Sequence, residues 1–135
     1  GVFIQSGTMI EVDPRWPGFV FNTTCLIGPG GILYKYRKVN PWIPFEVHAS
    51  PHDVPGYDEP LFPVADTEIG RIGCAKRHDW VCPDAIRQLA INGDQVLVRV
   101  TAFFAQPRRD HSPARPPGRV DDRLGCRGDR RAAGR

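Results

Sequence analysis

A helical pattern lies between two β-strand patterns near the middle of the sequence. The flanking runs, 68–75 and 95–104, are rich in aliphatic and β-branched residues, as buried strands are. Between them, segment 84–93 places three apolar side chains on one helical face: Ile86, Leu89 and Ala90. Pro83 suits the first position of this helix, and Asn92-Gly93 suits its end. A strand, a helix and a second strand in this order predict an α/β fold.

A β-hairpin is predicted upstream of this unit. The runs 19–27 and 32–37 are rich in aromatic and β-branched residues, and Gly28-Pro29-Gly30-Gly31 between them favours a tight turn. The stretch 40–63 contains six prolines, which lack a backbone donor and interrupt regular structure. We therefore expect a long loop between the hairpin and the strand-helix-strand unit.

Charge is divided unevenly along the 135 residues. Residues 1–106 contain nine Lys and Arg against eleven Asp and Glu, a net charge of −2, whereas residues 107–135 contain nine arginines against four aspartates, a net charge of +5. The C-terminal segment has Val120 and Leu124 as its only larger aliphatic residues, too few to offset the entropy lost on ordering it. We expect one domain in residues 1–106 and a disordered, arginine-rich tail in residues 107–135.

Several features bear on location and cofactors. No apolar run approaches the roughly 20 residues that a membrane-spanning helix needs, and the first residues lack the basic segment of a signal peptide. We expect no membrane contact and a cytoplasmic protein with four reduced thiols: Cys25, Cys74, Cys82 and Cys126. The only methionine is Met9, which predicts a truncated chain. No pattern indicates a cofactor.

The segment Tyr36-Arg37-Lys38-Val39-Asn40-Pro41-Trp42 resembles the lysine motif of the nitrilase superfamily of carbon-nitrogen hydrolases. Residues 22–31 are similar to the strand-turn-strand that leads into this motif, and residues 79–87 and 89–97 resemble the segment after the family's nucleophile. The resemblance covers about residues 1–104 and implies an incomplete α-β-β-α sandwich. The proline-rich loop at 41–46, which ends in a glutamate, is most similar to the aliphatic amidase and formamidase branch.

The resemblance also implies a reaction, the hydrolysis of a small amide or nitrile. Family members use a cysteine, a lysine and a glutamate. The thiolate attacks the carbon atom, the ammonium stabilises the negative charge that develops, and the carboxylate transfers protons. A homo-oligomer is a further expectation, because family members commonly associate.

Lys38 corresponds to the catalytic lysine of the family, and Glu46 to a second glutamate that many family sites carry beside it. Alignment on Asp79-Trp80 and Pro83-Asp84 places Arg77 where the family has its nucleophilic cysteine. A guanidinium stays protonated and has no lone pair with which to attack a carbonyl. The resemblance therefore implies an impaired enzyme or a non-catalytic remnant.

Other parts of the catalytic set are unmatched. The general-base glutamate belongs to a motif that would precede residue 22, and Glu11 does not fit that motif. Cys74 is the alternative nucleophile nearest to position 77, but residues three apart on a strand point to opposite faces. Cys82 is interpreted as a small buried apolar residue.

Zinc chemistry is a further alternative. Three potential zinc ligands recur every four residues, as on one face of a helix: Cys74, His78 and Cys82. His48 and His52 repeat this spacing inside the proline-rich loop. Prolines disfavour a helix in both places, so we predict no metal site.

The basic tail offers a competing function. Arginine-rich segments neutralise phosphates and bind nucleic acid without sequence preference. Residues 107–135 lack the aromatic side chains that would stack on bases, which disfavours this interpretation. Translation of GC-rich DNA in a shifted reading frame would also give a segment of this composition, and a similar local error would explain Lys76-Arg77.

Overall fold

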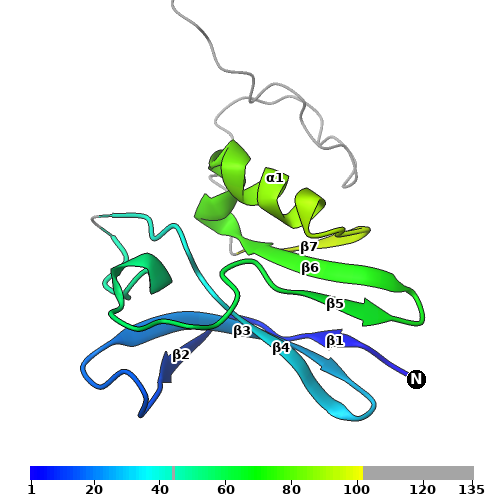
Figure 1. The fold of residues 1–135 in the computed structure, drawn as a ribbon, viewed down its shortest axis with the longest axis horizontal. Helices are drawn as coiled ribbons and strands as arrows, with labels where there is room; N and C mark the ends of the chain where they lie inside the picture. Colours follow the sequence, from blue (N-terminus) through cyan, green and yellow to red (C-terminus); the bar gives the residue numbers. More distant parts are fainter. Residues whose placement is uncertain (44, 102–135) are drawn as a thin grey trace, which may run out of the picture. The chain divides into compact units, whose positions relative to one another are not determined.

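The computed structural model of the protein describes residues 1–43 and 45–101, which belong to one compact unit, Gly1–Phe103. Two β-sheets and one α-helix make up this unit (Figure 1). Within the described residues, no helix is both long and apolar enough to cross a membrane. The tail at 107–135 lies outside them, and with it the predictions of disorder and nucleic-acid binding.

The first sheet is antiparallel and is built around one long strand, β3 (Val20–Gly28). β4 (Gly31–Arg37) pairs with β3 as the predicted hairpin, with Gly31 at φ 122°, a conformation that favours glycine. Two short strands pair with different parts of β3: β1 (Ile4–Gln5) and β2 (Met9–Val12). Neither short strand was expected from the sequence.

The second sheet has β6 (Gly70–Lys76) at its centre. β7 (Val96–Val100) runs parallel to β6, and α1 (Pro83–Ile91) connects them, which confirms the predicted strand-helix-strand unit. β5 (Val64–Thr67) is antiparallel to β6 and was not predicted. Residues 68 and 69 form the turn between β5 and β6, and Gly70 follows it at φ 114°. β6 therefore begins two residues later than expected.

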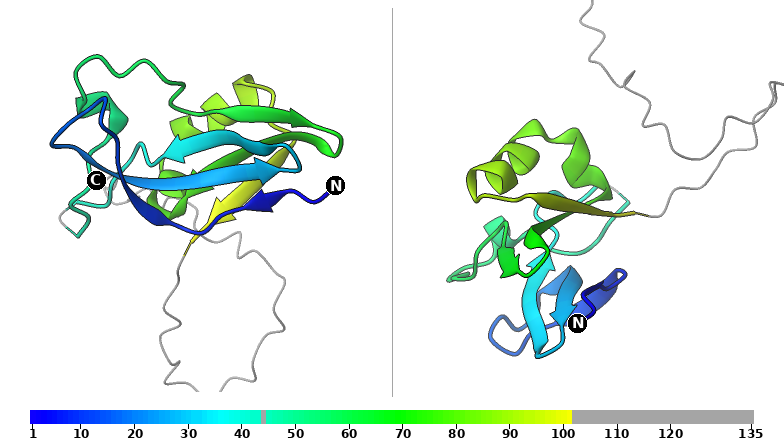
Figure 2. Two further views of the ribbon diagram at one scale, coloured as in Figure 1. Left: turned by 90° about the horizontal axis from the view of Figure 1, so that it is seen from below. Right: turned by 90° about the vertical axis from the view of Figure 1, so that its right-hand side faces the viewer.

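α1 packs on the second sheet through Ala85 and Leu89, which are buried. Gly73 on β6 allows this close approach, because a Cβ atom there would lie 3.0 Å from Cδ2 of Leu89. The prediction that Ala90 shares the buried face is wrong, since the helix turns this residue toward solvent. Figure 2 shows α1 on the side of the second sheet that faces away from the first.

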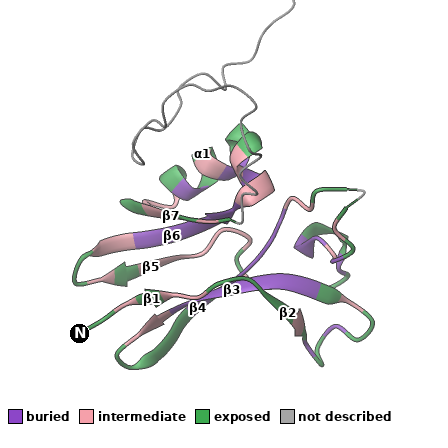
Figure 3. Ribbon diagram, turned by 180° about the vertical axis from the view of Figure 1, so that it is seen from behind, coloured by how far each residue is buried: buried purple, intermediate pink, exposed green. Residues whose placement is uncertain are grey.

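The two sheets enclose the main hydrophobic core. Leu26, Tyr34 and Tyr36 contribute to it from the first sheet, and Ile72 and Cys74 from the second. Figure 3 shows buried residues along both β3 and β6. The described residues thus form three layers, one helix and two sheets, and confirm the predicted α/β class.

The proline-rich loop after β4 is anchored to the first sheet. Oγ of Ser50 donates a 2.7 Å hydrogen bond to the carbonyl of Val39, and the same hydroxyl accepts from His52 at the start of the short 3-10 helix η1 (Pro51–Asp53). The backbone N–H of Ala49 donates to the carbonyl of Val20 at 2.8 Å. These contacts bring the middle of the loop back beside the end of β4.

Arg37, the last residue of β4, is 1% exposed and surrounded by acidic side chains. Its guanidinium donates to Glu11 at 2.7 and 2.9 Å and to Asp13 at 2.9 Å, and it also contacts Glu59. A buried cation is tolerated only where carboxylates pair with it. This network fixes the end of β4 and therefore the position of the next residue, Lys38.

Candidate functional site

Lys38 and Glu46, which the family resemblance assigns to one site, are in direct contact. The Lys38 side chain is 1% exposed, and its Nζ donates to Oε2 of Glu46 at 2.5 Å. The backbone N–H of Lys38 donates to the carbonyl of Asn22 at 2.9 Å, so β3 holds the lysine in place. Because the ammonium group of Lys38 is buried and paired with Glu46, it points toward the loop.

Glu46 is held on both sides. Its Oε2 also accepts a 2.5 Å hydrogen bond from the backbone N–H of Trp42, within a turn that the N–H of Glu46 closes onto the Trp42 carbonyl at 3.1 Å. Burial raises the pKa of Glu46, but the hydrogen bonds from Lys38 and Trp42 outweigh burial and lower it. Glu46 is therefore a carboxylate at neutral pH that orients Lys38.

Arg77 begins the 3-10 helix η2 (Arg77–Val81), directly after β6. Its φ is 30°, and it is the one residue other than glycine with a positive φ among residues 1–43 and 45–101. Such a conformation is costly for a residue with a Cβ atom, and it is common at functional sites. The strain falls on the position that the resemblance assigns to the nucleophile.

The side chain of Arg77 turns toward the loop. Its guanidinium carbon lies 4.8 Å from the centre of the Trp42 ring, and the N–H of Trp42 binds Glu46. Arg77 makes no ion pair with any described residue. A protonated guanidinium in this place provides donors and positive charge, but no nucleophile.

Lys76 is a site residue that the sequence analysis missed. It ends β6, is 2% exposed, and donates through Nζ to Oδ1 of Asn22 on β3. Burial, together with the positive charge of Lys38, lowers the pKa of Lys76 to about 8. Cys74 lies two residues earlier on β6 and is also buried. Because residues two apart on a strand point to the same face, strand alternation could have predicted that Lys76 lies between the sheets.

Asp79 joins the segments that carry these groups. Its Oδ2 accepts from the hydroxyl of Tyr36 at 2.7 Å and from the N–H of Lys76 at 2.9 Å. Its Oδ1 accepts from the backbone and side-chain amides of Asn40, both at 3.0 Å. A fully buried carboxylate thus connects the end of β4, the start of the loop and the end of β6.

Cys74 lies in the core between the sheets. The expectation that Cys74 and position 77 point to opposite faces of one strand does not apply, because β6 ends at Lys76 and Arg77 begins η2. Burial raises the pKa of its thiol to about 12. The thiolate is the reactive form, so Cys74 is inert at neutral pH. Among the described residues, no group of three or more side chains could hold a metal ion, and the structure does not gather Cys74, His78 and Cys82.

His48 was considered in the sequence only as a potential zinc ligand, and its place beside Glu46 was not predicted. It is 7% exposed, and its Nε2 lies 4.0 Å from Oε2 of Glu46. No described residue provides a hydrogen-bond partner for this nitrogen. Burial lowers the pKa of His48 and, with the charges of Lys38 and Lys76, outweighs the charge of Glu46, which raises it. A neutral imidazole with an unsatisfied nitrogen therefore faces the lysine and glutamate side chains.

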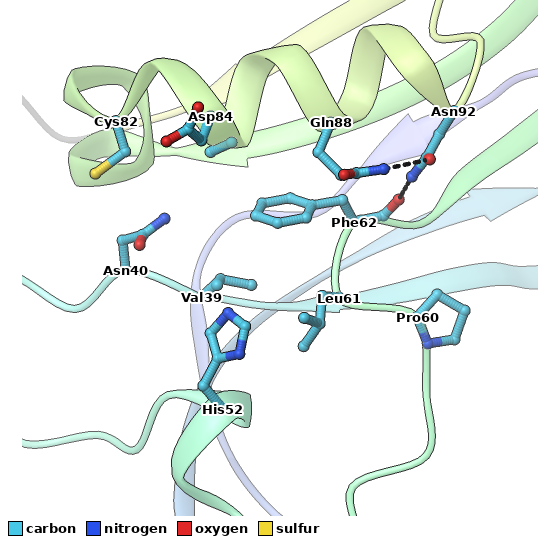
Figure 4. A pocket seen from close by; sticks show the side chains of 11 residues that line it. Val39, Asn40, His52, Pro60, Leu61, Phe62, Cys82, Asp84, Gln88 and Asn92 are labelled. Carbon is cyan, nitrogen blue, oxygen red and sulfur yellow. Dashed lines mark hydrogen bonds between the residues drawn. The ribbon is translucent and has the colours of Figure 1, made fainter.

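A separate cavity of about 660 Å³ lies between the loop and α1 (Figure 4). Side chains from both elements line it, among them Asn40, Leu61, Cys82, Asp84 and Gln88. Neither Lys38 nor Glu46 is among its lining residues. Burial raises the pKa of the Cys82 thiol, so this cavity has no activated nucleophile either.

Relatives with curated descriptions match most of this chain. A formamidase of Bacillus cereus (strain B4264) is 33% identical over 108 residues, which cover 78% of this chain and 29% of the formamidase. Formamidases of Bacillus thuringiensis (strain Al Hakam) and Bacillus anthracis (strain CDC 684 / NRRL 3495) match with the same identity and coverage. The chain thus spans about 29% of the length of these relatives.

The fold is similar to that of a solved nitrilase-superfamily protein. The crystal structure of Saccharomyces cerevisiae Nit3, a member of branch 10 of that superfamily, superposes with a TM-score of 0.60 at 23% identity. The similarity covers 76% of this chain and 35% of Nit3. The sequence profile described as carbon-nitrogen hydrolase matches residues 2–116. The chain therefore belongs to the carbon-nitrogen hydrolase family, the nitrilase superfamily, and represents part of the length of such a domain.

Proposed function

We propose that this chain carries part of an amidase-type site for a small amide or nitrile, and that it does not complete hydrolysis. The observation that carries the proposal is the buried 2.5 Å contact between Lys38 and Glu46, beside a strained turn that begins with Arg77. Of the family's cysteine, lysine and general-base glutamate, the lysine is matched by Lys38, with the second glutamate, Glu46, beside it; an arginine occupies the place of the cysteine, and the general-base glutamate is unmatched.

Without a nucleophile, hydrolysis cannot begin. Lys38 is positioned to stabilise negative charge on a carbonyl oxygen, and Glu46 orients Lys38. Hydrolysis further requires a thiolate that bonds to the carbonyl carbon while the amide nitrogen leaves with a proton. The described thiols are Cys25, Cys74 and Cys82, and burial raises the pKa of each. The proposed site therefore binds a carbonyl compound without attacking it.

The small-amide class rests on the relatives. The matched Bacillus proteins are described as formamidases, at 33% identity. Because the chain spans about 29% of their length, substrate, self-association and activity of the whole protein belong to the proposal. A cytoplasmic location suits the free thiols of Cys25, Cys74 and Cys82.

We further propose that the three described layers are part of an α-β-β-α sandwich. In that arrangement a second helical layer covers the outer face of the first sheet. Several apolar side chains of this sheet are exposed, as such a covering layer would require: Ile4, Met9 and Ile32.

Ammonia release from formamide and acetamide by the full 135-residue chain tests the proposed function. We expect no release above the buffer blank, with or without Lys38→Ala. Release that Lys38→Ala abolishes would show a working enzyme and overturn the proposal.

A labelling experiment tests whether position 77 faces the site. The Arg77→Cys thiol should react with iodoacetamide, and formamide should slow that reaction by occupying the site. Arg87→Cys is the matched control, because Arg87 is exposed on α1, and formamide should leave its labelling unchanged. Labelling of both thiols that is insensitive to formamide would contradict the assignment.

A further inference from the structure

The cavity between the proline-rich loop and α1 has no role in the proposed function. Its volume of about 660 Å³ suits a small molecule, since ligand sites measure roughly 300–1,000 Å³. Its lining residues include neither Lys38 nor Glu46, so a ligand bound there would contact a different set of side chains.

The inner wall of this cavity is apolar. Leu61 and Phe62 line it from the loop, Val39 from the chain just after β4, and Ala85 from α1. The ring of Phe62 stacks on that of Tyr36, with centroids 6.2 Å apart, so the core holds it in place. Figure 4 shows this ring between α1 and the segment that carries Val39. The apolar body of a ligand would leave water against these side chains, which favours binding.

The charged groups around the cavity favour a cation. Asp84, in the first turn of α1, is a lining residue, and no lysine or arginine lines the cavity. Oδ1 of Asp84 accepts from Arg87 at 2.7 Å, while Oδ2 accepts from no described residue. A carboxylate oxygen at the rim is therefore available to a positively charged ligand.

The amide side chains that line the cavity use their nitrogen atoms within the protein. Nδ2 of Asn40 donates to Asp79 at 3.0 Å, and Nε2 of Gln88 donates to Asn92 at 2.9 Å. Nδ2 of Asn92 donates to the carbonyl of Phe62 at 2.8 Å. In contrast, Oδ1 of Asn40 and Oε1 of Gln88 accept no hydrogen bond from the residues that the structure describes. These oxygens are acceptors for a ligand that brings N–H donors.

We infer that this cavity binds a small primary ammonium ion that carries an apolar body, such as phenethylammonium. The ammonium group supplies one positive charge for Asp84 and N–H donors for the amide oxygens of Asn40 and Gln88. The ring packs against Leu61 and Phe62. A carboxylate ligand is disfavoured, because it would bring acceptors to a rim that consists of acceptors and carries a negative charge.

Calorimetric titration of the full chain with phenethylammonium chloride, at pH 7 and constant ionic strength, tests the inference. We expect saturable binding that weakens about threefold in Asp84→Asn, because an exposed ion pair is worth little, and roughly tenfold in Gln88→Lys, which adds a cation to the rim. Asp66→Asn is the matched control, since Asp66 is an exposed carboxylate of β5 that does not line the cavity. This variant should bind as the wild type does.

Two further ligands separate the contributions of charge and ring. 3-Phenylpropionate carries a similar apolar body with the opposite charge, and ethylammonium carries the charge without the ring. Both should bind roughly tenfold more weakly than phenethylammonium, since each lacks one half of the match.

Alkylation of Cys82 tests where the ligand binds. This thiol lines the cavity and is partly exposed, so iodoacetamide can reach it. Phenethylammonium should slow its alkylation, and ethylammonium at the same concentration should slow it less. Peptide mass spectrometry identifies the modified cysteine.

Several results would overturn the inference. They are equal binding of phenethylammonium and 3-phenylpropionate, equal weakening in Asp84→Asn and Asp66→Asn, and alkylation of Cys82 that saturating phenethylammonium leaves unchanged. Absence of saturable binding would overturn it as well. None of these results bears on the proposed function, which is tested by ammonia release and by labelling at position 77.

Discussion

The hydroxyl of Tyr36 donates a 2.7 Å hydrogen bond to Oδ2 of Asp79, across the interface between the two sheets. Tyr36 belongs to β4 and immediately precedes Arg37 and Lys38, while Asp79 follows β6. This bond therefore sets the distance between the lysine side of the site and the turn at Arg77. Burial and the nearby carboxylate both raise the pKa of Tyr36, so the phenol keeps the proton that it donates.

Tyr36→Phe should destabilise the protein by about 1–3 kcal/mol, because Asp79 loses a donor in a buried place. Urea denaturation measures the change. Tyr34→Phe is the control, since its hydroxyl bonds to Gln5 at 3.0 Å at the less buried end of the interface. A Tyr36→Phe protein no less stable than Tyr34→Phe would show that Asp79 does not need this donor.

Lys76 should make the protein more stable at alkaline pH. Its pKa is about 8 in the folded chain and 10.5 in the reference state, so the unfolded chain binds more protons between these values. The free energy of unfolding contributed by this group therefore rises from pH 8 to 10.5. Lys76→Met should remove that rise, which denaturation of both proteins at several pH values would detect. Parallel pH profiles for the two proteins would count against a depressed pKa.

Arg77→Gly should be more stable than Arg77→Ala. Both remove the guanidinium, but only glycine adopts φ near 30° without a Cβ penalty, which is roughly 1 kcal/mol or more. Thermal unfolding of the pair isolates backbone strain from charge. Equal stability of the two variants would mean that the turn relaxes in alanine, and hence that it is not strained by its surroundings.

Glu11 should make the free energy of unfolding depend on pH in the acid range. Although burial raises its pKa, hydrogen bonds from Arg37, Thr23 and Lys35 lower it to about 2. The stabilisation is therefore complete above pH 4.5 and is lost as the pH falls toward 2. Glu11→Gln should cost about 3 kcal/mol at pH 7, because Arg37 loses a partner. The deficit should vanish near pH 2, and a deficit independent of pH would contradict the ionic cause.

Local patterns explain which parts of the fold could be predicted. The hairpin of β3 and β4 and the β6-α1-β7 unit have apolar runs, glycines and a proline at the expected positions. β1, β2 and β5 have two to four residues, and their conformation depends on pairing with β3 or β6. Such strands exist through tertiary hydrogen bonds, which leave no periodic signal.

The same distinction applies to the site. Lys38 and Glu46 lie eight residues apart in one motif, and their pairing followed from the family resemblance. Lys76 and Asn22 are 54 residues apart, and they meet because two sheets pack together. The sequence analysis considered His48 only as a potential zinc ligand, by its spacing from His52, and its unsatisfied nitrogen is visible only in three dimensions.

The buried carboxylate of Asp79 ties the geometry of this part of the protein to its folding. Its four hydrogen bonds join the end of β4, the start of the loop and the end of β6, so folding requires this arrangement independently of any catalytic activity. Replacement of Asp79 is therefore expected to lower the free energy of unfolding, whether or not residue 77 can act as a nucleophile.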